Sequence, residues 1–169
     1  MAMSHLPERV LAQLHIVAHE AAEVFGERGY RIDAAVQLDS SFCVSSRPKS
    51  ALTRSLVDEG VRIGASRAGV DFLDARGGAV DLRFEVGGRY LVFRVKRARR
   101  LQSGEVDILT NAGSTWGIED DIAIIPDEPW VFAFIASEDG LIELFVAPVY
   151  GATEGSPGHL ILGPEIRLE

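Results

Sequence analysis

The sequence predicts an α+β fold, with two helices packed on one face of a mainly antiparallel sheet of about six or seven strands. Two observations support this class. Apolar residues recur at helical spacing in the N-terminal third of the chain, whereas alternating or continuously apolar segments separated by glycines dominate the rest. Helices that precede the strands, rather than alternate with them, are typical of α+β domains.

The composition predicts one globular domain over residues 1–169. Hydrophobic residues make up 47% of the chain and charged residues 25%. No apolar run approaches the roughly 18 residues of a membrane span, and "MAMSHLPERV" lacks the apolar stretch of a signal peptide. Cys43 is the only cysteine, so an intrachain disulfide is excluded. We therefore expect a cytoplasmic protein without membrane contact.

The first helix is expected over residues 7–28, where Pro7 suits the first turn and Gly29 the end. Its apolar residues recur every three or four positions: Val10, Leu14, Val17, Ala21 and Val24. A second helix is expected from about Pro48 to Val61, with one apolar side formed by Leu52, Leu56, Val57 and Val61. Between the two helices, "RIDAAVQLD" and "SFCVSS" are candidates for short strands or loops.

The strands follow the helices. Three are expected at 70–74, 79–86 and 89–98, separated by "ARGG" and "GG", whose glycines suit tight hairpin turns. Residues 101–118 predict a loop with at most one short helix. A second hairpin is expected from 129–137 to 141–149, and its first strand is apolar enough to be covered on both faces. The tail offers two short edge strands.

The first hairpin has a predictable register. If Gly87 and Gly88 form the turn, Val86 lies opposite Arg89 and Asp81 lies opposite Arg94. Alternation then assigns one set to the core face: Val80, Leu82, Phe84, Val86, Leu91, Phe93 and Val95. The other face, expected to be solvated, carries Asp81, Arg83, Glu85, Val92, Arg94 and Lys96.

Residues 70–100 resemble the core of the PD-(D/E)xK nuclease family. Asp81 matches the family's acid and Lys96 its lysine, whereas Arg94 stands in place of the middle acid. The resemblance implies a nuclease that uses Mg²⁺ or Mn²⁺, with Glu20 or Glu23 of the first helix supplying the missing carboxylate. Because a cation at position 94 opposes a metal ion, a simple cross-strand ion pair between Asp81 and Arg94 is the alternative.

Charge is divided unevenly along the chain. The net charge is −8, yet residues 1–100 carry 16 basic against 12 acidic residues, and residues 101–169 carry one basic against 13 acidic residues. Seven cations concentrate in what we call the basic stripe: Arg83, Arg89, Arg94, Lys96, Arg97, Arg99 and Arg100. The stripe could bind an acidic protein partner, the acidic C-terminal half of a second copy, or nucleic-acid phosphates, or it could be a solvated edge.

Other patterns predict little chemistry. His15 and His19 have a spacing compatible with zinc, but the sequence places no third ligand. Cys43 is expected to be a buried thiol, and Trp116 to pack into the core. A dense acidic segment is expected to form a solvated rim or partner surface: Glu119, Asp120, Asp121, Asp127 and Glu128.

We therefore expect a non-catalytic binding or regulatory protein of the bacterial cytosol, without a cofactor. It would engage a protein partner or its own copy through the basic stripe and an acidic C-terminal surface. The alternatives are a divergent or decayed PD-(D/E)xK nuclease, with Asp81, Lys96 and Glu20 at its site, or a regulator that binds nucleic acid without cutting it.

Overall fold

The computed structural model describes residues 5–74, 80–110, 128–137, 142–155 and 157–169. Its helices are α1 (Glu8–Arg28), α2 (Tyr30–Val36), the 3₁₀ helix η1 (Ser40–Cys43) and α3 (Arg47–Ala68). Its strands are β1 (Asp71–Asp74), β2 (Val80–Val86), β3 (Arg89–Arg97), β4 (Arg99–Arg100), β5 (Val106–Asp107), β6 (Leu109–Thr110), β7 (Glu128–Ala136), β8 (Ile142–Ala152), β9 (Gly158–Leu162) and β10 (Ile166–Arg167). The predicted α+β class is confirmed.

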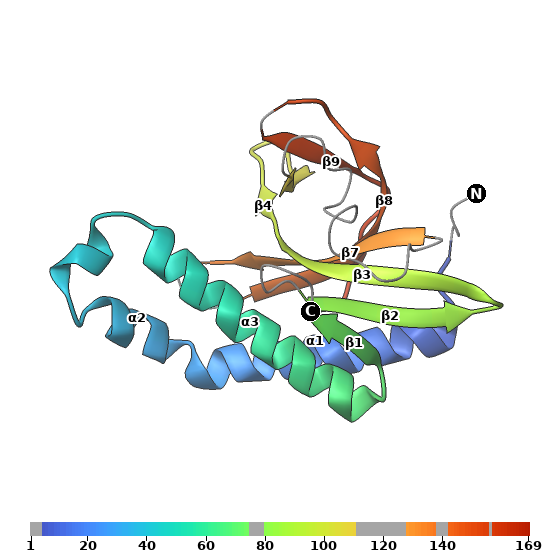
Figure 1. Ribbon diagram of the computed structural model, residues 1–169, viewed down its shortest axis with the longest axis horizontal. Helices are drawn as coiled ribbons and strands as arrows, with labels where there is room; N and C mark the ends of the chain where they lie inside the picture. Colours follow the sequence, from blue (N-terminus) through green and yellow to red (C-terminus); the bar gives the residue numbers. More distant parts are fainter. Residues whose placement is uncertain (1–4, 75–79, 111–127, 138–141, 156) are drawn as a thin grey trace.

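The main sheet has the strand order β1-β2-β3-β7-β8-β9-β6, and β10 pairs with β8. Its described pairs are antiparallel except for β3 and β7, which run parallel. In Figure 1, α1 and α3 lie side by side along the sheet, and β8 and β9 curl away from the helices. Strands β4 and β5 form a separate two-stranded ribbon.

Helix α1 matches its prediction, since all five predicted apolar positions are buried. Helix α3 continues to Ala68, seven residues past the predicted end at Val61. Gly60 and Gly64 explain the difference, because they face α1 rather than interrupt α3. A Cβ on Gly60 would lie 2.7 Å from Ala21 Cα, and one on Gly64 would lie 2.7 Å from Val17 Cα. The two glycines therefore allow close packing of the helices.

The segment between the two long helices was predicted wrongly as a strand or loop. Residues Tyr30–Val36 form helix α2, which follows α1 directly because Gly29 adopts a helical conformation instead of a left-handed one. Ile32 is its only buried residue. The sequence pattern is weak here because a seven-residue helix with a single buried side chain has no visible periodicity.

The first hairpin has the predicted register. Asp81 pairs with Arg94, Leu82 with Phe93 and Val86 with Arg89. Gly87 and Gly88, with φ of 58° and 79°, form the turn, as a two-residue hairpin connection requires. The predicted core face packs against α1 and α3 in the first core. The prediction of a fully solvated opposite face is wrong, because a second core lies there.

Strands β7 and β8 explain the second core. Trp130, Phe132 and Phe134 of β7 belong to the first core, whereas Val131 and Ala133 point the other way into the second. The predicted cover on both faces of this strand is thereby confirmed. Val92 of β3 contributes to the second core, together with residues from the curled part of the sheet: Phe145, Ala147, Val149 and Leu160.

No helix in the described ranges is long and apolar enough to cross a membrane.

The loop predicted over 101–118 is extended in part, because it contains β5 and β6. The rest of this segment, from residue 111 onward and including Trp116, lies outside the described residues.

The helix contact gives a testable prediction. Gly64→Ala should lower the free energy of unfolding by about 1–3 kcal/mol, since the new methyl group collides with the backbone of Val17. This loss outweighs the gain of about 1 kcal/mol in helix propensity. Urea denaturation would measure it. The matched control is Gly26→Ala in α1, where a Cβ meets nothing within 4 Å; it should stabilise by about 0.5–1 kcal/mol. Equal effects of the two changes would contradict the packing account.

Candidate anion-binding site

Asp81 and Arg94 form an ion pair across β2 and β3. Arg94 Nε donates to Asp81 Oδ1 at 2.8 Å, and Arg94 Nη2 donates to Asp81 Oδ2 at 3.0 Å. Each residue is only 3% exposed. The predicted pairing is therefore present, but it is buried at the border of the second core rather than solvated. Two parallel hydrogen bonds of this kind fix both side chains.

This arrangement does not fit the Mg²⁺ or Mn²⁺ that the nuclease resemblance implies. Both carboxylate oxygens of Asp81 accept hydrogen bonds from Arg94, whose positive charge opposes a metal ion. Glu20 lies in the helical layer and binds Arg67 of α3 at 2.5 Å, whereas Asp81 faces away from the helices. Among the described residues, no group of three or more potential metal ligands comes together. The nuclease hypothesis stays an untested prediction.

Most of the basic stripe is paired within the chain. Arg83 lies 3.4 Å from Asp71 and 5.7 Å from the ring centroid of Tyr90. Arg99 donates to Asp107 at 2.7 Å.

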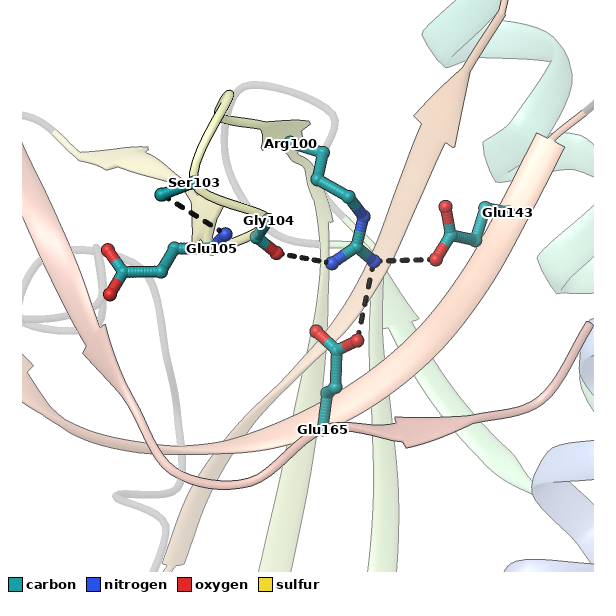
Figure 2. Close-up of polar contacts among 6 residues, drawn as sticks. All are labelled: Arg100, Ser103, Gly104, Glu105, Glu143 and Glu165. Atoms are coloured by element: carbon teal, nitrogen blue, oxygen red, sulfur yellow. Dashed lines mark hydrogen bonds and ion pairs between the residues drawn. The ribbon is translucent and has the colours of Figure 1, made fainter.

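Arg100 is held by two acids of the C-terminal half. As Figure 2 shows, it donates to Glu143 at 2.6 Å and to Glu165 at 3.3 Å, and also to the carbonyl oxygen of Gly104 at 2.9 Å. The acidic half of the sequence therefore neutralises part of the basic half inside one molecule.

Within the ranges that the structure describes, the side chains of three cations of the stripe have no ion pair or hydrogen bond: Arg89, Lys96 and Arg97. Arg89 follows the hairpin turn, whereas Lys96 and Arg97 lie at the opposite end of β3. The unpaired charge is thus concentrated where β3 leaves the hairpin.

A pocket of about 410 Å³ lies at this end of β3. Its lining residues come from α3, β3 and the segments that follow: Arg54, Lys96, Arg97, Ala98, Arg99, Asp107, Leu109 and Thr110. Four of them are cations and one is a carboxylate. Because that carboxylate, Asp107, already binds Arg99 and His159, the pocket as a whole favours an anion.

The protonation of Lys96 reflects its surroundings. Burial, followed by the neighbouring charges of Arg94 and Arg54, lowers its pKa to about 8, although Asp81 acts in the opposite direction. A lysine near other cations without a counterion of its own is the expected partner of a bound anion, which would restore the usual preference for the charged form.

Asp107 fixes one wall of the pocket. Burial by itself would raise its pKa, but hydrogen bonds from His159 and Arg99 outweigh burial and lower the pKa below its ordinary value. His159 Nδ1 lies 2.6 Å from Asp107 Oδ1. The ionised Asp107 thereby holds Arg99 at the rim.

Two residues at the pocket, Arg54 and His159, were not predicted from the sequence as part of this site. Arg54 is one turn of α3 away from buried Val57 and Asp58, in a helix that carries several arginines, so nothing in the sequence distinguishes it. His159 reaches Asp107 only because β6 pairs with β9. Both contacts join segments that are distant in the sequence, and one-dimensional patterns do not report such contacts.

The other predicted candidates lie away from this pocket. His19 contacts Glu169 at 3.3 Å and Glu23 at 3.1 Å, and the hydrogen bond to Glu169 followed by the charge of Glu23 raises its pKa. Cys43, expected to be buried, is exposed. Glu128 is buried in β7 rather than on a solvated rim, and the rest of the predicted acidic segment lies outside the described residues.

A scan against models of known protein families found no match, and searches of curated proteins and of solved structures found none either.

The side chains of the pocket suit it to bind an anion. Cationic groups gather at the end of β3, Lys96 has no counterion of its own among the described residues, and Asp107 on the wall is already paired with Arg99.

The buried pair predicts a large asymmetry between two aspartates of the first three strands. Asp81→Ala should cost about 3–5 kcal/mol of unfolding free energy, because Arg94 remains buried without this partner. Asp71→Ala, which removes the exposed partner of Arg83, should cost less than about 1 kcal/mol. Chemical denaturation of both variants tests this. Similar costs would show that the Asp81 pair is not desolvated.

Asp58 of α3 predicts a pH effect on stability. Its Oδ1 has no hydrogen-bond partner among the described residues, and burial raises its pKa to about 6, against the opposing charges of Arg54 and Arg62. The folded state thus binds this proton more tightly than the unfolded chain, so ionisation of Asp58 destabilises the fold above about pH 6.

Asp58→Asn should therefore be more stable than the native chain at pH 8 by about 1–3 kcal/mol. The difference should shrink as the pH falls through 6 and disappear near pH 4, as measured by urea denaturation across this range. Glu59→Gln, a change at the exposed neighbouring position, is the control and should show no such trend. A constant difference between Asp58→Asn and the native chain would exclude the proposed cause.

Proposed function

We propose that this protein is a non-catalytic binding or regulatory protein that recognises an anionic group in the pocket at the end of β3. The observation that carries the proposal is the convergence of Arg54, Lys96 and Arg97 on one pocket, in which Asp107, the one carboxylate among the described lining residues, is already paired. Lys96 in particular lacks a partner in the described chain, and its lowered pKa records the cost of that position.

The pocket contains only part of the basic stripe that the sequence suggested as a binding surface. Arg99 and Arg100 are bound to carboxylates of the same chain, so they have less charge to offer a partner than the sequence suggests. Recognition is therefore assigned to Lys96 and Arg97, assisted by Arg54 from α3. Similarly, Glu143 and Glu165 are engaged internally, which weakens the case for a second copy binding through the acidic half.

The two nucleic-acid alternatives have less support. A protein that lies along duplex DNA commonly neutralises about 6–10 phosphates, whereas this chain has a net charge of −8 and pairs most of its basic stripe internally. A metal-dependent nuclease would need Asp81 to exchange Arg94 for a metal ion. The pocket fits a compact anion better than an extended polyanion.

Anion binding can be tested by titrating inorganic phosphate into the ¹⁵N-labelled protein and following its amide resonances. The shifts should cluster at Arg54, Lys96 and Arg97, and Lys96→Ala or Arg97→Ala should weaken the affinity at least about tenfold, the loss of about 1.4 kcal/mol. Arg89→Ala removes an equally unpaired cation from the far end of β3 and should leave the affinity unchanged. Shifts spread evenly over the surface would contradict a defined site.

Lys96 also predicts how the affinity depends on pH. Because its pKa is about 8, the charged form is lost as the pH rises, and phosphate affinity should fall up to about tenfold between pH 7 and pH 9. Lys96→Arg keeps a positive charge throughout this range and should remove the pH dependence. The same decline in both proteins would mean that another group is responsible.

A further inference from the structure

A second cavity adjoins the cationic pocket and shares Arg97 with it. Its volume is about 200 Å³. The polar side chains of its wall come from α2, from α3 with its preceding residue, from the end of β3 and from the residue after β7: Asp33, Ser46, Lys49, Ser50, Thr53, Arg97 and Ser137. Arg97 therefore lines both cavities, and each cavity also contains a lysine, Lys96 in the larger and Lys49 in the smaller.

The charge of the second cavity is again positive on balance. Among the described residues of its wall, Lys49 and Arg97 face a single carboxylate, Asp33, which lies 3.4 Å from Lys49. Both members of that pair are about half exposed, so their attraction is weak. Ser46 and Ser50 offer hydroxyl donors beside the lysine. Thr53 uses its hydroxyl within the helix, donating to the backbone oxygen of Lys49.

We infer that the ligand of this protein is a small oligophosphate, with one phosphate group in the larger pocket against Lys96 and Arg54 and the next against Lys49, Arg97 lying between them. This inference rests on the proposed anion-binding function and names the chemical class of its ligand. A guanidinium group presents its donors in a planar fork that matches two phosphate oxygens, which suits Arg97 to the shared position.

Multiple charge favours phosphate over carboxylate. A single carboxylate brings one negative charge to a pocket where Arg54, Lys96 and Arg97 meet, whereas linked phosphates bring at least two. Burial, followed by the charges of Arg94 and Arg54, lowers the pKa of Lys96, and the ligand with the higher charge density best offsets this cost.

Limited extent favours a small ligand over a nucleic-acid strand. The two cavities together have room and cations for two or three phosphate groups. Arg99 at the rim of the larger pocket is engaged by Asp107, and Arg100, which follows it, is engaged by Glu143 and Glu165. Sequence-independent binding of a single strand also uses aromatic side chains for base stacking. Among the described residues that line the two cavities, Phe25 is the one aromatic residue, and it belongs to the first core.

The test is isothermal titration calorimetry of the full chain with orthophosphate, pyrophosphate and tripolyphosphate, in buffer without divalent cations. We expect pyrophosphate to bind at least about tenfold more tightly than orthophosphate, a difference of about 1.4 kcal/mol. Lys49→Gln should remove that advantage, because the second phosphate is the group that reaches Lys49. Arg97→Ala should weaken both ligands. Arg89→Ala is the control for loss of one cation elsewhere.

The outcomes separate the inference from the function on which it rests. Equal affinities for orthophosphate and pyrophosphate, or an unchanged advantage in Lys49→Gln, would overturn the oligophosphate and leave the anion pocket intact. Failure of every phosphate to bind would overturn both. Citrate or a glutamate-rich peptide binding more tightly than pyrophosphate would assign the pocket to carboxylates, and tighter binding of an oligothymidylate without terminal phosphate would assign it to nucleic acid.

Discussion

Strands β7 and β8 carry apolar side chains on both faces, so neither side of the central sheet can be left in water. One side is covered by α1 and α3, whose close contact at Gly60 and Gly64 makes a compact layer. The other side is covered by the sheet itself, as its far strands curl over. The cationic pocket lies between α3, the end of β3 and residues 107–110.

The curl of the sheet also brings basic and acidic side chains together. The chain is basic in its first part and acidic in its last, and the curl of the sheet brings Glu143 and Glu165 to Arg100. Such contacts reduce the exposed charge of both halves. The cations of the stripe that stay unpaired in the described chain are few, and two of them, Lys96 and Arg97, lie together at the end of β3. A local shortage of counterions, rather than the overall charge of −8, therefore defines the candidate site.

Local sequence features predicted what depends on local geometry. Gly87 and Gly88 fix the hairpin turn and hence the pairing of Asp81 with Arg94, and the spacing of apolar residues fixes α1. The burial of that ion pair could not be predicted, because the cover comes from a distant part of the fold. Arg54 was missed for a similar reason, since it joins the pocket only through the packing of α3 beside the end of β3.

The parallel pairing of β3 with β7 has a consequence for how the chain folds. The β2–β3 and β7–β8 hairpins each join neighbouring segments, and such contacts form quickly because little chain has to be ordered. Their junction pairs two strands that residues 98–127 separate in the sequence, and bringing such distant positions together has a larger entropic cost. The joining of the two hairpins therefore carries the larger entropic cost of folding, and Arg97 of the pocket lies in that junction, opposite Phe134 of β7.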